Sequence, residues 1–254
     1  MIESPPPRGI RRGVSLLPSL FTLANVFCGW SCVVYAMRGE LETAAPFIGV
    51  ALVLDMLDGR IARMTNTASE FGVQLDSLAD IISFGMAPAV LAYAWGLTPL
   101  GRLGWAAGFL FVTAAALRLA RFNIQQHTDK RFFVGLASPA AAALVASTVF
   151  YYPYGLQTKP EAYLGVLLAV VPALLMVSTL RFRSFKGVDL GERRRYTVLA
   201  GFALLIALIV TFPQEVLLIM AYAYLASGFI DLAIHKLRRR DHDATPPPPQ
   251  PLAA

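Results

Sequence analysis

The stretch LDMLDGRIARMTNTASEFGVQLDSLAD, residues 54–80, decides how this chain folds, because it places four aspartates within otherwise apolar segments: Asp55, Asp58, Asp76 and Asp80. The first two are three residues apart and the last two are four apart, so each pair shares one face of a helix. A hairpin that turns around residues 67 and 68 brings Asp58 level with Asp76, and Asp55 level with Asp80. The spacing therefore predicts that four carboxylates converge at one depth of a helical hairpin.

The composition around this hairpin is that of a membrane protein. Of the 254 residues, 56% are hydrophobic and 15% are charged, whereas an ordinary soluble domain has about 25% charged residues. This apolar share exceeds what a single soluble core can bury, so a lipid bilayer must solvate much of the chain. The composition argues against a soluble enzyme.

Apolar stretches long enough to cross a bilayer as helices, about 20 residues each, recur along the sequence. We therefore expect an all-α, polytopic integral membrane protein with about eight transmembrane helices. These are expected at residues 15–37, 44–65, 73–96, 104–122, 136–153, 163–180, 196–212 and 215–235. The transmembrane domain then covers residues 15–236, between a disordered basic arm at 1–14 and a disordered proline-rich tail at 237–254.

The net charge of +6 follows from the expected topology. An even number of spans puts both termini on the same side of the membrane. Of the 22 basic residues, all but Arg38, Arg102 and Lys159 then lie on that side. The positive-inside rule makes it the cytoplasm, so we expect a bacterial-type inner membrane protein whose acidic hairpin opens to the cytoplasm. Because topology explains the basic excess, the charge does not indicate nucleic acid as a partner.

The four aspartates of the hairpin need compensating interactions. On insertion scales an aspartate near the middle of a membrane costs about 2.5–3.5 kcal/mol, and neighbouring carboxylates disfavour each other's ionisation. Hard divalent cations prefer oxygen ligands, and no cysteine or suitably placed histidine joins the hairpin, so Mg²⁺ or Mn²⁺ fits better than zinc. A structural ion-pair network and the proton or ion relay of a transporter are the alternatives.

Gly59 and Arg63 lie beside the acids, one helical turn apart. Glycine is unfavourable inside a helix, so Gly59 indicates the close approach of a ligand or another backbone. Arg63 lies one turn nearer the cytoplasm than the acids, where it can pair with a phosphate that the metals also hold. This end of the hairpin is therefore expected to bind phosphate.

The same residues fit a known signature. The pattern D-x2-D-G-x2-A-R-x8-G-x3-D-x3-D, from Asp55 to Asp80, is matched at every fixed position, and the chain resembles the CDP-alcohol phosphotransferases. Four further stretches resemble the serine-accepting branch of that family: DSLADIISFGMAPA (76–89), LRLARFN (117–123), GLASPAAA (135–142) and SFK (184–186). The chain departs from the family pattern at Ser19, where members often have Asn, and in GLASP, which replaces GLPSP. Neither change touches the aspartates.

The resemblance implies an enzyme that transfers a phosphatidyl group from CDP-diacylglycerol to the hydroxyl of L-serine and releases CMP. It implies two divalent ions per site, Mg²⁺ or Mn²⁺, bound by Asp55, Asp58, Asp76 and Asp80, with Asp80 also acting as the catalytic general base. Two metals can clamp a diphosphate and stabilise the leaving group, and a carboxylate can take the proton of a weak hydroxyl nucleophile. The family also implies a homodimer in the lipid bilayer.

The nucleotide is expected beside Gly59 and Arg63, with the loop TNTASEFG closing over it. In this loop Thr65 and Ser69 are expected to donate hydrogen bonds, and Gly72 belongs to the signature. Loop serines and threonines also commonly serve as turn or cap residues.

The acceptor, or a phosphate group, is expected to bind at Arg118, Arg121, Asn123 and Lys186. Positive-inside anchoring alone is the other explanation for the two arginines. The signature fixes the donor chemistry but not the alcohol, so glycerol 3-phosphate, inositol phosphate and choline are alternative acceptors. Ser77 argues against the glycerophosphate branch, which typically has proline at this position.

Overall fold

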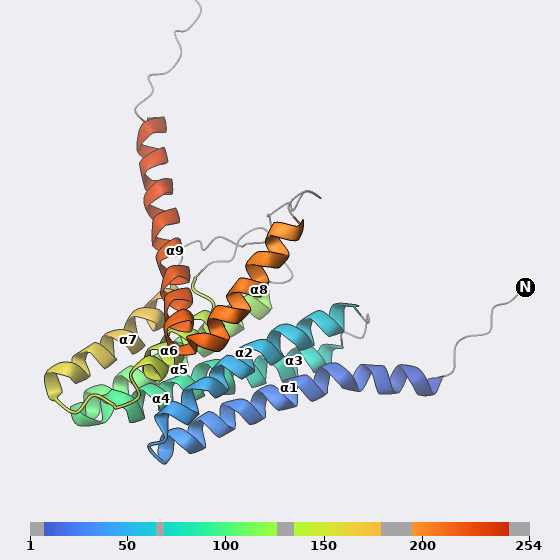
Figure 1. Ribbon diagram of the computed structural model, residues 1–254, viewed down its shortest axis with the longest axis horizontal. Helices are drawn as coiled ribbons and strands as arrows, with labels where there is room; N and C mark the ends of the chain where they lie inside the picture. The colour runs from blue at the N-terminus through green and yellow to red at the C-terminus, as the bar shows by residue number, and fades with distance from the viewer. Residues whose placement is uncertain (1–7, 65–68, 126–134, 179–194, 244–254) are drawn as a thin grey trace, which may run out of the picture.

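The computed structural model describes residues 8–64, 69–125, 135–178 and 195–243, and their regular structure is entirely helical (Figure 1). The expected all-α class is thus confirmed for these residues. In chain order the helices are α1 (Arg8–Met37), α2 (Leu41–Met64), α3 (Glu70–Asp80), η1 (Ile81–Met86), α4 (Ala87–Ala92), η2 (Tyr93–Leu97), η3 (Thr98–Leu100), α5 (Arg102–Gln125), α6 (Ser138–Tyr151), α7 (Lys159–Val177), α8 (Arg195–Thr211) and α9 (Pro213–Asp243).

Four helices of the described residues are long and apolar enough to cross a membrane: Pro18–Met37, Glu70–Leu100, Arg102–Ile124 and Lys159–Val177. The sequence led us to expect about eight spans. Helix α2 has spanning length at 24 residues, but its aspartates and arginines interrupt the apolar run. Helix α6 is apolar but only 14 residues long. The acids that make the site thus weaken the membrane signal of the helix that carries them.

Two helices continue past the expected ends of the transmembrane domain. Helix α1 begins at Arg8, within the arm expected to be disordered, and α9 ends at Asp243, within the expected tail. Once a helix is nucleated, each added residue gains a backbone hydrogen bond, so an apolar span carries the helix into its charged flank. Residues 1–7 and 244–254 lie outside the described residues.

Helix α1 packs against both α2 and α3, the two helices that carry the aspartates (Figure 1). The turn between α1 and α2 contains Gly39, whose φ of 78° is a conformation that glycine adopts readily. Next to this turn the rings of Tyr35 and Phe47 stack with centroids 5.5 Å apart. These contacts fix the register of α1 against α2.

The second helix of the hairpin continues without a break from Glu70 to Leu100 but changes its winding. Directly after Asp80 it widens into a π-helical segment, η1, and it does so again at η2. Segments of this kind are rare and often lie at functional sites. In η1 the residues Ser83, Phe84 and Gly85 are buried. The altered winding sets which residues beyond Asp80 face the other helices.

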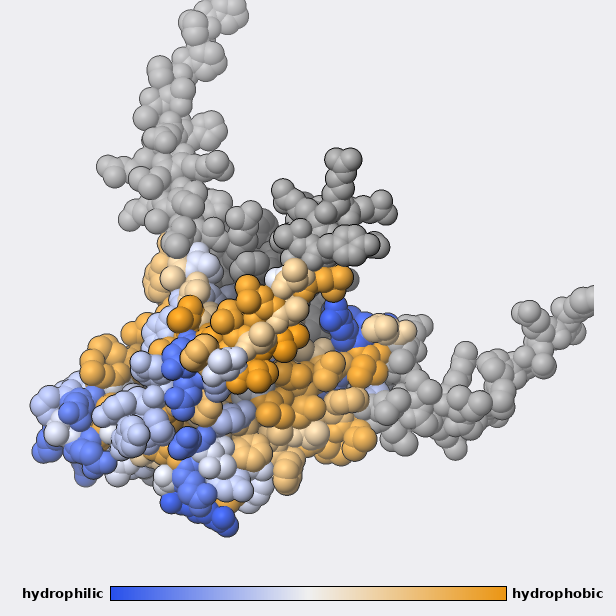
Figure 2. Space-filling model, in the orientation of Figure 1, coloured by the Kyte–Doolittle hydropathy of each residue, from blue (hydrophilic) through white to orange (hydrophobic). Residues whose placement is uncertain are grey.

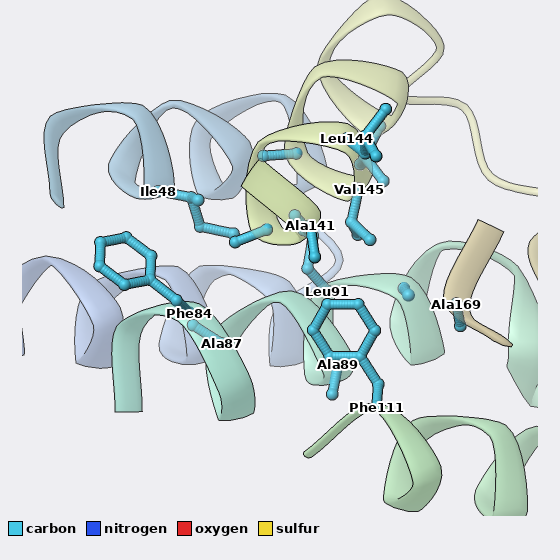
Figure 3. Packing of buried hydrophobic residues seen from close by; sticks show 14 of the residues in the cluster. Ile48, Phe84, Ala87, Ala89, Leu91, Phe111, Ala141, Leu144, Val145 and Ala169 are labelled. Carbon is cyan, nitrogen blue, oxygen red and sulfur yellow. The ribbon is translucent and has the colours of Figure 1, made fainter. Parts of the chain in front are cut away.

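The core lies between α1, α2, α4, α5, α6 and α7. Figure 3 shows Phe84, Leu91 and Phe111 packed among alanines such as Ala87 and Ala141. Small residues allow helices to approach closely where lipid, rather than water, surrounds them.

Large apolar side chains are exposed on the outside of several helices, and Figure 2 shows them spread over α8 and the helices beside it. On α1, for example, Phe27 is 64% exposed and Trp30 is 62% exposed. Exposed apolar surface on this scale is unfavourable in water. It agrees with a surface that faces lipid.

Gly29 of α1 lies directly against η1. A Cβ atom at Gly29 would be 2.6 Å from Oγ of Ser83 and 2.9 Å from its Cα. The hydroxyl of Ser83 in turn donates a hydrogen bond of 2.9 Å to the carbonyl oxygen of Asn25. This contact locks α1 to the helix that carries Asp80, three residues after that aspartate.

We therefore expect Gly29→Ala to destabilise the protein by about 1–3 kcal/mol, because the added methyl overpacks a backbone contact. Gly49→Ala is the matched control, since a Cβ at Gly49 meets no atom within 4 Å and alanine favours helix. Thermal unfolding in detergent measures both. Equal midpoints for the two variants would show that the α1–η1 contact is not tight.

Candidate active site

Three of the four aspartates form a compact group. Asp55 of α2, with Asp76 and Asp80 of α3, each offer a carboxylate oxygen, and these atoms all lie within 4.8 Å of one another. Asp55 and Asp80 thus lie close together across the hairpin, as its geometry predicts. Carboxylates at this separation repel one another when ionised, so the group calls for a cation.

The group also has unused hydrogen-bonding capacity. The Oδ1 atoms of Asp76 and Asp80 are buried and have no hydrogen-bond partner. Leaving such an oxygen unpaired costs about 1–3 kcal/mol, and more if it is charged. A hard divalent cation takes oxygen ligands only, as this donor set provides. The residues thus fit Mg²⁺ or Mn²⁺.

Asp58 lies beside this group but faces α1. It is 4% exposed, and its Oδ2 accepts a hydrogen bond of 3.0 Å from Oγ1 of Thr22. It still lies close enough to Asp76 for their charges to repel. Sequence reasoning missed Thr22 as a partner, although a threonine in an apolar span is a signal for such a hydrogen bond. The predicted role of Asp58 as a metal ligand stays a prediction.

The C-terminal end of α2 holds Gly59 and Arg63, and both are exposed. Nε of Arg63 donates a hydrogen bond of 2.8 Å to the carbonyl oxygen of Gly59. A Cβ at Gly59 would meet no atom within 4 Å. Among the described residues, the close approach of another backbone, one of the two explanations for this glycine, is therefore not found.

Ser69 and Gly72 contact each other at the start of α3. The hydroxyl of Ser69 caps the helix by accepting a hydrogen bond of 3.0 Å from the backbone N–H of Gly72. This is the cap role that loop serines commonly have. Thr65, the other loop residue expected to contact the nucleotide, lies outside the described residues.

Arg118 of α5 is the cation that the fold brings to the acids. Its Nη1 donates a hydrogen bond of 2.9 Å to Oγ of Ser138, and its guanidinium attracts the charge of Asp80. Nε of Arg118 is buried without a partner. Ser138, which sequence reasoning missed, is fully buried at the start of α6, where Pro139 occupies the first turn. The sequence signal that could have identified Ser138 is the GLASP stretch, which contains it.

The other residues expected at the acceptor have different positions. Nδ2 of Asn123 donates a hydrogen bond of 3.0 Å to Oγ of Ser77, which ties α5 to α3 next to Asp76. Arg121 is half-buried near the end of α5. Lys186 lies outside the described residues.

Comparison with known families agrees with this site. The family model described as CDP-alcohol phosphatidyltransferase matches residues 15–180, and one described as CDP-alcohol phosphatidyltransferase 2 matches residues 193–227. The chain belongs to the CDP-alcohol phosphatidyltransferase family. Members of this family generally use divalent metals, which agrees with the carboxylate group.

Three curated relatives illustrate the similarity. A Helicobacter pylori protein named CDP-diacylglycerol–serine O-phosphatidyltransferase is 38% identical over 219 residues, which cover 85% of this chain and 90% of the relative. A Bacillus subtilis protein of the same name is 32% identical, over 68% of this chain and 93% of the relative. A Methanothermobacter thermautotrophicus protein named archaetidylserine synthase is 33% identical, over 68% of this chain and 71% of the relative.

We predict that Asp76→Asn weakens Mn²⁺ binding by at least about tenfold, because it removes a charged ligand from the group. Electron paramagnetic resonance of Mn²⁺ with the purified protein measures this. Glu70→Gln is the matched control, since Glu70 is an exposed acid on the same helix. If both variants bind Mn²⁺ as the unmodified protein does, the aspartate group is not the metal site.

Proposed function

We propose that this chain is an integral membrane CDP-diacylglycerol–serine O-phosphatidyltransferase. It transfers the phosphatidyl group of CDP-diacylglycerol to the hydroxyl of L-serine and releases CMP. The observation that carries the proposal is the convergence of Asp55, Asp76 and Asp80 in a chain of this family. The names of the relatives support serine as the acceptor, because serine is common to them while the lipid differs.

The acids divide into metal ligands and a base. Asp55, Asp58, Asp76 and Asp80 are the residues that hold two divalent ions, Mg²⁺ or Mn²⁺. When bound, these ions supply Lewis-acid stabilisation of the charge that develops on the diphosphate. Asp58, held by Thr22, keeps its carboxylate next to the group.

Asp80 is the proposed general base. It accepts the proton of the serine hydroxyl while the hydroxyl oxygen attacks the phosphorus, and the bond from phosphorus to the CMP oxygen breaks. Its Oδ1 has no hydrogen-bond partner, so it is available for this proton. The guanidinium of Arg118 lies close enough to Asp80 for their charges to attract.

The donor and acceptor lie on opposite sides of the acids in this proposal. The cytidine diphosphate binds at the cytoplasmic end, beside Gly59 and Arg63, with the loop from Thr65 through Ser69 to Gly72 around it. There Arg63 can give up its hydrogen bond to the carbonyl oxygen of Gly59 and donate to a phosphate oxygen of the nucleotide instead.

The acceptor's carboxylate pairs with Arg118, which is held in place by Ser138. Arg121, Asn123 and Lys186 are proposed to add to binding of the acceptor or of phosphate. Because Asn123 already donates to Ser77, its contribution is to hold α5 and α3 in register as well as to line the site.

The proposed topology has about eight transmembrane helices, with both termini and the site on the cytoplasmic side of a bacterial-type inner membrane. The transmembrane domain is residues 15–236, flanked by the basic arm at 1–14 and the proline-rich tail at 237–254. The four candidate spans and the apolar exterior support a multi-pass protein. A homodimer in the bilayer is the proposed assembly.

Purified protein in detergent, given CDP-diacylglycerol and Mn²⁺, should release CMP when L-serine is added. The rate with L-serine should exceed the rates with glycerol 3-phosphate, inositol phosphate and choline by at least about a hundredfold. The attack on the donor diphosphate is the same for every alcohol, so only the binding site of the acceptor discriminates among them. Release of CMP with another alcohol instead would reassign the acceptor. No release with any alcohol would overturn the proposal.

The same assay tests the base. Asp80→Asn should abolish serine-dependent CMP release yet keep CDP-diacylglycerol binding within about tenfold, because the other acids still hold a metal. Glu42→Gln, which changes an exposed acid in the first turn of α2, is the control with unchanged rate. Turnover by Asp80→Asn near the rate of the unmodified protein would remove Asp80 as the base.

A further inference from the structure

Asn25 of α1 is the least satisfied polar side chain among the described residues. It is 0% exposed, and neither its Nδ2 nor its Oδ1 has a hydrogen-bond partner. Because both amide atoms are unpaired, exchanging their positions does not change this result. A buried amide with two open hydrogen-bonding groups is costly. It needs either a structural partner or a ligand.

The contacts of its neighbours place Asn25 at the acids. Thr22, one turn before Asn25, bonds to Asp58. Helices α1 and α2 are antiparallel, so a residue three positions after Thr22 lies level with a residue three positions before Asp58, which is Asp55. The carbonyl oxygen of Asn25 accepts the hydrogen bond of Ser83, three residues after Asp80.

Asn25 therefore lies at the end of the acid group that is farther from the cytoplasm. Gly59 and Arg63 lie at the other end, where the nucleotide is placed. Arg118 faces Asp80 from α5. The region around Asp80 thus combines a carboxylate, a guanidinium and a free amide that come from three different helices.

The chemistry of the amide selects the ligand. A metal ion can satisfy only Oδ1, and a phosphate or an acyl ester only accepts hydrogen bonds, so it can satisfy only Nδ2. A zwitterionic amino acid offers both kinds of group. Its ammonium donates to Oδ1, and its hydroxyl or carboxylate oxygen accepts from Nδ2.

We propose that Asn25 is a specificity-determining residue that binds the amino-acid group of the acceptor, opposite Arg118. This proposal rests on the proposed serine transfer and adds a residue of α1 to it. In this arrangement Arg118 holds the carboxylate and Asn25 holds the ammonium. The hydroxyl is thereby directed to Asp80. An alcohol without the amino-acid group leaves the amide unpaired and is rejected.

The test is steady-state kinetics of Asn25→Ala in detergent with Mn²⁺, with L-serine and CDP-diacylglycerol varied in turn. We expect the KM for L-serine to rise by at least about tenfold, while the KM for CDP-diacylglycerol stays within about twofold. Asn25→Ser, whose side chain is too short to bridge but still polar, should show the same split. It also guards against a folding defect in the alanine variant.

Cys32→Ala is the matched control, because Cys32 is a fully buried residue two turns further along the same helix. Both KM values should be unchanged in it. An unchanged KM for L-serine in the Asn25 variants would overturn the proposal, and so would an equal loss for both substrates, which indicates a structural or donor-binding role. Absence of serine-dependent CMP release by the unmodified protein is a separate result that contradicts the proposed function itself.

Discussion

The helices of this fold hold carboxylates together against their mutual repulsion, and the rest of the structure is arranged around that constraint. Asp55, Asp76 and Asp80 approach within 4.8 Å on two neighbouring helices, in a protein whose exterior is apolar. The carboxylates cannot reduce this repulsion by moving apart into water, because the helices that carry them are packed together. A divalent cation relieves the repulsion and fills the open oxygen positions at once. The closeness of the carboxylates, which is unfavourable without a cation, is what makes the group a candidate metal site.

The surrounding structure keeps the acids in place. Thr22 holds Asp58 from α1, the contact of Gly29 with Ser83 fixes the π-helical segment after Asp80, and Asn123 ties α5 to α3. Two of these contacts come from α1 and the third comes from α5, and all three hold the helices that carry the acids. A rigid frame of this kind keeps the carboxylates in a fixed geometry.

The sequence predicted the hairpin well because helical periodicity fixes which aspartates share a face. Spacing alone paired Asp55 with Asp80. It did not predict that Asp58 turns to Thr22, because this depends on the register between α1 and α2, which distant turns and ring contacts set. It also missed the partners that Arg118 and Asn123 find in Ser138 and Ser77, which come from separate segments of the chain. The π-helical winding after Asp80 leaves no mark in a 3.6-residue pattern. Apolar length predicted helices where the described residues have them. Four of these are long and apolar enough to span a membrane, and α2 is not among them because its aspartates and arginines interrupt the apolar run.

The most direct test of this account is the thermal stability of the protein in detergent with Mn²⁺ and with a chelator, compared with that of Asp55→Asn. Mn²⁺ is expected to raise the unfolding midpoint of the unmodified protein, because a cation that binds only the folded state stabilises it. In chelator Asp55→Asn should be the more stable of the two proteins, since one repelling charge is gone, and it should gain much less from Mn²⁺. An equal Mn²⁺ shift in both proteins, or no shift in either, would contradict the claim that these carboxylates form a divalent metal site.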